Sequence, residues 1–111
     1  MAETEIIKIK NLLIELLKEI GIRVERIIIF GSYVKGKGKK HSDIDIMVVS
    51  KDFRNKDIFE IANLTKDVHW KLVENVMKPF DIIYCSDEKW EQGNSLIINS
   101  AKKEGVIIYG A

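Results

Sequence analysis

Apolar residues recur at helical spacing in two long segments of the chain. Residues 3–20 and residues 57–77 place isoleucine, leucine and valine three or four positions apart, with charged residues between them. This spacing lines one face of an amphipathic helix. Gly21 and Pro79 follow the two segments and are typical of helix ends. The pattern therefore predicts two helices, each with one buried face.

Short runs of β-branched residues predict four strands. They are residues 26–30, 43–49, 80–85 and 106–109. Only ten residues separate Ser32 from Asp43, whereas a parallel crossover needs about a dozen or more. The first two strands are therefore expected to be antiparallel neighbours, with the end of one beside the start of the other.

A third helical region follows the strand at 80–85. Ser86 is suited to cap its N-terminus, and the helix is expected to extend to about Glu104, with Gly93 and Asn94 favouring an interruption. Helices alternating with strands predict an α/β (α+β) fold, in which helices pack against a small mixed β-sheet.

The composition narrows the class of protein. The chain has 111 residues and a net charge of +1, which predicts one domain over residues 1–111 and gives no global attraction to nucleic acid or membranes. Cys85 is the only cysteine and is expected to be buried, and both tryptophans are expected to pack. No apolar run approaches the roughly 20 residues of a membrane span. A charged start unlike a signal peptide makes the cytoplasm the expected location.

Three aspartates are candidates for a metal site. Asp43 and Asp45 alternate with isoleucines, so both carboxylates point to one face of their strand. Asp81 opens the third predicted strand. Oxygen ligands in this arrangement suit Mg²⁺ or Mn²⁺. The alternative is that Asp43 and Asp45 are solvated residues at a strand edge and that Asp81 is a turn residue after Pro79.

A glycine-serine pair ends the first predicted strand. Gly31 and Ser32 could expose backbone N–H groups to a phosphate. The stretch from Gly31 to Lys37 also matches the start of a P-loop, but Gly38 stands where that motif needs a hydroxyl, and no helix fits before Asp43. The P-loop interpretation is rejected, and the lysines of this loop form either a phosphate contact or a solvated tip.

These motifs together resemble the nucleotidyltransferase superfamily of DNA polymerase β. They are Gly31-Ser32, then Asp43 and Asp45 as Asp-x-Asp, then Asp81 on a later strand. The short chain and the run "FGSYVKG…SDIDIMVVS" resemble the minimal nucleotidyltransferases (MNT), which are the antitoxin partners of HEPN toxins. The resemblance covers nearly the whole chain and implies a polymerase β-like fold.

The resemblance implies a metal-dependent transfer of AMP from ATP to a hydroxyl group, with a tyrosine of a HEPN toxin as the expected acceptor. Two Mg²⁺ ions, or Mn²⁺, would be held by Asp43 and Asp45, with Asp81 completing the catalytic site. The residues expected to bind the nucleotide are Gly31, Ser32, Lys35 and Ser42.

Two other functions compete with adenylylation. The protein could be an antitoxin of weak or absent activity that neutralises its partner by binding alone, in a hetero-oligomer. It could also bind nucleic acid through Lys37, Lys39 and Lys40, although the near-zero net charge counts against this.

Overall fold

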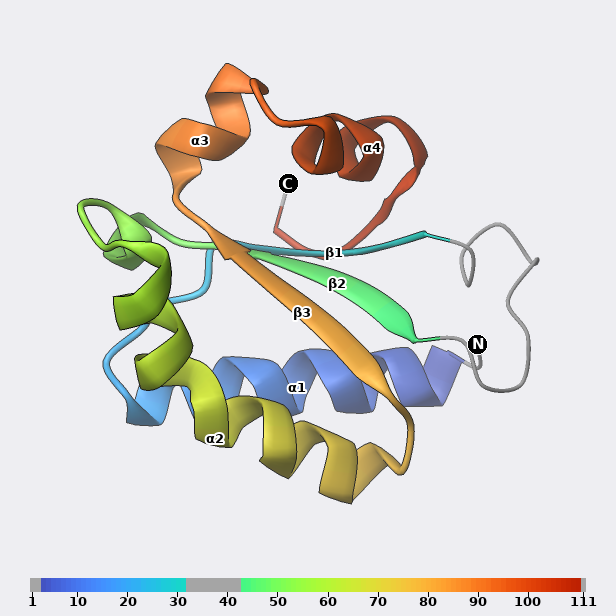
Figure 1. Cartoon of the computed structure of the whole chain (residues 1–111). Helices are drawn as coiled ribbons and strands as arrows, with labels where there is room; N and C mark the ends of the chain where they lie inside the picture. The colour runs from blue at the N-terminus through green and yellow to red at the C-terminus, as the bar shows by residue number, and fades with distance from the viewer. Residues whose placement is uncertain (1–2, 32–42, 111) are drawn as a thin grey trace.

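The computed structural model describes residues 3–31 and 43–110 (Figure 1). The elements, in chain order, are α1 (Glu3–Glu19), β1 (Arg26–Phe30), β2 (Ile44–Val49), the short 3₁₀ helix η1 (Lys51–Phe53), α2 (Ile58–Val76), β3 (Phe80–Cys85), α3 (Asp87–Gln92), α4 (Leu96–Glu104) and β4 (Val106–Tyr109). The predicted strands agree with these bounds to within one residue, whereas η1 was not predicted.

The four strands form one mixed sheet in the order β3-β2-β1-β4. β1 is antiparallel to both β2 and β4, and β2 is parallel to β3. The expected antiparallel pairing of the first two strands and the expected mixed α/β fold are both confirmed. The helix α2 provides the crossover that allows β3 to lie parallel to β2.

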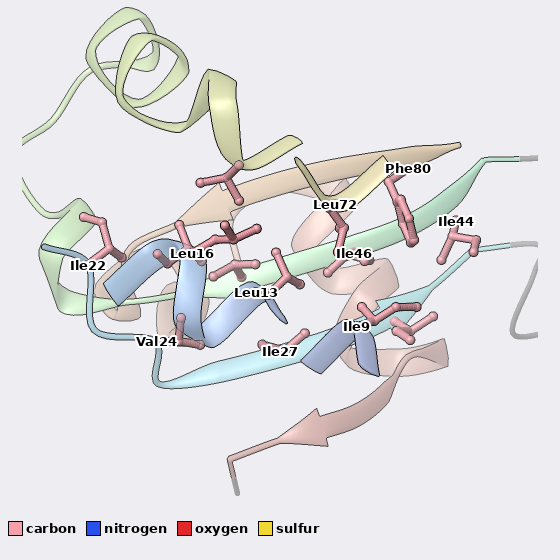
Figure 2. Packing of buried hydrophobic residues seen from close by; sticks show 14 of the residues in the cluster. Ile9, Leu13, Leu16, Ile22, Val24, Ile27, Ile44, Ile46, Leu72 and Phe80 are labelled. Atoms are coloured by element: carbon pink, nitrogen blue, oxygen red, sulfur yellow. The ribbon is translucent and has the colours of Figure 1, made fainter. Parts of the chain in front are cut away.

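Helices cover both faces of the sheet, with α1 and α2 on one side and α3 and α4 on the other (Figure 1). Alternate residues of β2 point to opposite faces. Ile44, Ile46 and Val48 pack in the core with α1 and α2, where Leu13 and Leu72 meet them (Figure 2). Because both faces are covered, β2 is almost continuously apolar after Asp45.

The core on the other face contains Ile28, Met47 and Cys85, packed under Trp90 of α3 and Ile98 of α4. Cys85 is buried, as predicted. The two tryptophans differ. Trp90 is 5% exposed, but Trp70 is 62% exposed on α2, so the expectation that both pack is wrong for Trp70.

The ends of the later helices follow from local sequence. The Ser86 side chain accepts a hydrogen bond from the Lys89 backbone N–H at 3.2 Å, so it caps α3 as predicted. Gly93 has a φ of +61°, which ends α3 and separates it from α4. The predicted interruption of the last helix is therefore confirmed. Asp57 and Glu60 form a capping box at the start of α2.

Within residues 3–31 and 43–110, none of the helices has both the length and the apolar character needed to cross a bilayer.

Leu72 and Trp70 provide a matched test of this packing. Leu72 is fully buried and Trp70 lies on the exposed side of the same helix. We expect Leu72→Ala to lower the free energy of unfolding by about 2–5 kcal/mol, because it leaves a cavity between α2 and the sheet. Trp70→Ala should change it by about 0.5 kcal/mol or less. Urea denaturation measures both, and equal effects would contradict the assigned core.

Candidate functional site

Two of the candidate carboxylates are neighbours across the parallel strand pair. Asp45 of β2 lies in register with Asp81 of β3. Met47 and Ile83, two residues further along each strand, pack on the face covered by α3 and α4. The two-residue period of a strand places Asp45 and Asp81 on that same face. Asp43 precedes β2 by one residue and is exposed.

The electrostatics of Asp45 reflect this crowding. Burial raises the pKa of Asp45, and the negative charges of Asp81 and then Asp43 raise it further. Negative charges on neighbouring carboxylates repel each other unless a proton or a cation balances them. The site therefore favours binding of positive charge beside Asp45.

Gly31 is placed against the same carboxylate. It follows Phe30, which is the partner of Asp45 in the antiparallel register of β1 and β2. Its φ is +85°, and a Cβ at this position would overlap the carboxylate oxygen Oδ2 of Asp45. Glycine is required here for both reasons: the left-handed backbone and the close approach of the carboxylate.

The donor chemistry of these carboxylates fits Mg²⁺. This cation is commonly held by one or two carboxylates, with waters and substrate phosphates supplying the other oxygens. Asp45, with Asp43 or Asp81, supplies such a set. In the part of the chain that the structure describes, no group of three or more His, Cys, Asp or Glu side chains is arranged to hold one metal ion.

The structure brings four of the predicted site residues together at one end of the sheet, where β1 ends and β2 and β3 begin (Figure 1). These residues are Gly31, Asp43, Asp45 and Asp81. The other predicted nucleotide-binding residues lie outside the described residues and stay predictions; they are Ser32, Lys35 and Ser42. The lysines of the same loop also lie outside the described residues.

A family of known proteins matches the chain over most of its length. The family is described as a nucleotidyltransferase domain, and the match covers residues 7–108.

One curated relative is "Probable protein adenylyltransferase MntA" of Haemophilus influenzae, which is 41% identical over 46 residues. The aligned region covers 39% of this chain and 40% of that relative.

Solved structures share the fold. One is a toxin-antitoxin with AMP-PNP, with a TM-score of 0.65 and 22% identity over 92% of this chain and 73% of the other. Another is a tri-AMPylated HEPN toxin in complex with an MNT antitoxin from Shewanella oneidensis. Its TM-score is 0.58 at 20% identity, covering 96% of this chain and 73% of the other. At these identities the likeness establishes the fold.

The contact between Gly31 and Asp45 can be tested against a second glycine. Gly21 has a φ of +82° with no atom within 4 Å of an added Cβ. Gly21→Ala should therefore cost only the backbone strain, about 1 kcal/mol. We expect Gly31→Ala to cost more, because the methyl group also displaces the carboxylate. Urea denaturation of Gly31→Ala in an Asp45→Ala background should recover the excess, and no recovery would contradict the contact.

The raised pKa of Asp45 predicts a stability effect with a definite sign. The folded state disfavours the charged carboxylate, so the native Asp45 destabilises the protein above its folded pKa. Asp45→Asn should raise the melting temperature at pH 7, by an amount that solvent screening keeps small. The difference should vanish as the pH falls below about 3.9, where the carboxyl is neutral in both states.

Divalent cations provide the second half of this test. Mg²⁺ or Mn²⁺ should raise the melting temperature of the native protein and not that of Asp45→Asn. Asp67→Asn, on the exposed side of α2, is the matched control and should behave as the native protein. A lower melting temperature for Asp45→Asn at pH 7, or equal responses to the cations, would contradict this account.

Proposed function

The chain belongs to the nucleotidyltransferase domain family, and we propose that it transfers AMP from ATP to a tyrosine hydroxyl of a HEPN toxin. The observation that carries the proposal is that Asp45 of β2 and Asp81 of β3 are paired across the two strands, with Gly31 packed against Asp45. This arrangement places several carboxylate oxygens, whose negative charges repel one another, at one end of the sheet. Gly31 has no side chain, so the backbone and the Asp45 carboxylate can lie close together there.

The residues of the site suit this chemistry. A divalent cation, when bound, supplies positive charge that balances the charge on the attacking and leaving oxygens. Asp43 and Asp45 would hold it, with Asp81 as the third carboxylate. Asp81 is exposed and can accept a hydrogen bond from the attacking hydroxyl. The acceptor hydroxyl gives its proton to the Asp81 carboxylate while its oxygen forms a bond to the α-phosphorus of ATP. The bond between the α-phosphorus and the bridging oxygen of the β-phosphate breaks, and pyrophosphate leaves.

Gly31, together with Ser32, Lys35 and Ser42, is proposed to bind the triphosphate. Backbone N–H groups at the end of a strand that finishes in glycine are suited to phosphate oxygens.

Known proteins support the choice of donor and acceptor. The curated relative from Haemophilus influenzae is named as a protein adenylyltransferase. Among the proteins of the same fold, one toxin-antitoxin has AMP-PNP, and another complex holds a tri-AMPylated HEPN toxin. These names favour ATP as the donor, an MNT antitoxin as the role of this chain, and a HEPN toxin as its partner. We place the reaction in the cytoplasm, in keeping with the single unpaired cysteine, Cys85.

The test is labelling of the partner. The purified protein, the product of the adjacent gene, Mg²⁺ and ATP labelled at the α-phosphate are incubated together. We expect label on the partner, and a loss of about a hundredfold or more for Asp45→Asn, because the variant weakens metal binding. Asp67→Asn should label as the native protein does. Chelation of the metal should abolish labelling.

Two outcomes would overturn the proposal: no label on the partner, or equal labelling by Asp45→Asn. If unlabelled partner is still neutralised, and if Asp43→Asn and Asp45→Asn still protect cells from it, the protein acts by binding alone.

A further inference from the structure

The strand β3 lies at an edge of the sheet, with β2 as its neighbour on one side. The carbonyls of Pro79 and Cys85 accept hydrogen bonds from Ile44 and Ser50, at 3.0 and 3.1 Å. In a parallel pair the bonding residues alternate along the strand. The backbone groups of Asp81 and Ile83 therefore also face β2.

The residues of β3 that alternate with Asp81 and Ile83 direct their backbone groups to the side of β3 that has no neighbouring strand. The N–H and C=O groups of Ile82 and Tyr84 point away from β2, at the free edge of the sheet. An edge of this kind is a template for an additional strand.

A groove runs along this edge. It has a volume of about 480 Å³ and lies between β3 and residues 58–69 of α2. Ile61 of α2 and Ile82 of β3 form part of its apolar lining. The two residues of β3 with outward-facing backbone groups, Ile82 and Tyr84, both belong to its wall.

Tyr84 is part of this wall, and its hydroxyl lies beneath the accessible surface. Its hydroxyl is buried and makes no hydrogen bond of ordinary geometry with any described residue. Burial raises the pKa of Tyr84, and the nearby Thr65 hydroxyl offsets only part of this effect. The Thr65 hydroxyl itself donates to the Ile61 carbonyl at 2.7 Å.

The charges around the groove have one sign. Lys56 lies in the segment just before α2, Lys66 lies on α2, and Lys89 lies on α3, across the edge of β3. His69 adds an imidazole, and no acidic side chain is among the described residues that line the groove. The surroundings complement a segment that carries carboxylates beside its apolar residues.

We propose that an extended acidic segment of the acceptor protein adds to β3 as a fifth strand, with its carboxylates between Lys66 and Lys89. The inference rests on the proposed function, because it assigns the groove to the substrate of the same site. Asp81 directly precedes Ile82 and is in register with Asp45. At about 3.3 Å per residue of strand, a segment paired with Ile82 and Tyr84 carries its next residues to Asp81. The groove thus selects an acceptor by its sequence and directs its hydroxyl to the carboxylates.

The first test measures binding without nucleotide. A short fluorescein-labelled peptide of alternating valine and glutamate, with a central tyrosine, is titrated with the full chain and followed by fluorescence anisotropy. We expect K66E combined with K89E to weaken binding about tenfold or more. K71E, which reverses an exposed lysine of α2 outside the groove, is the matched control and should bind as the native protein does.

The second test measures whether the backbone of β3 forms hydrogen bonds with the peptide. Amide hydrogen exchange of Ile82 and Tyr84 should slow when the peptide binds, while Ile83, already bonded to β2, serves as an internal control. A peptide N-methylated at alternate residues, which removes the donors along one edge, should lose both binding and protection.

Several outcomes would overturn the inference. They are unchanged binding by the doubly reversed variant, binding without protection of Ile82 and Tyr84, and displacement of the peptide by an oligonucleotide, which would assign the groove to nucleic acid. Failure here is distinct from failure of the proposed function. The peptide assay needs no ATP, so partner labelling without peptide binding refutes only the docking mode, and peptide binding without labelling refutes only the transfer.

Discussion

The position of β2 between two strands and two helical layers is the constraint on which the site depends. Ile44, Ile46 and Val48 are buried on one face, and Met47 and Val49 on the other. A slip of one residue would exchange these faces and push Asp45 under α1 and α2, where its charge would lose solvation. The packing of β2 therefore defines the register on both sides, and with it the pairing of Asp45 with Asp81 and the approach of Gly31.

The carboxylates gathered in this way oppose folding. Burial and the charges of Asp81 and Asp43 raise the pKa of Asp45, and Gly31 leaves no side chain between the backbone and the carboxylate. The apolar packing on both faces of the sheet outweighs this local cost. A site that repels its own charges has affinity for a cation and, with it, for a phosphate-bearing substrate.

The strand β3 combines two roles because its residues alternate. Asp81 and Ile83 bond to β2 and direct their side chains to the face of the carboxylates, whereas Ile82 and Tyr84 direct their backbone to the open edge. Chemistry and recognition can therefore occupy adjacent residues without competing for the same hydrogen bonds. The lysines of α2 and α3 beside this edge favour a bound segment that carries negative charge.

The sequence by itself determined the α-helices and the four strands but not η1. It also determined the faces of β2, the antiparallel pairing of β1 with β2 and the break at Gly93. These features depend on local periodicity, loop length and turn chemistry. Only the tertiary structure decided that Asp81 lies beside Asp45, that α3 and α4 cover the face opposite α1 and α2, that Trp70 is exposed, and that β3 borders a lysine-rimmed groove. Each of these depends on contacts between segments far apart in the chain. The local pattern of apolar and polar residues indicates which face of a helix or strand is buried. It does not indicate which other helix or strand covers that face.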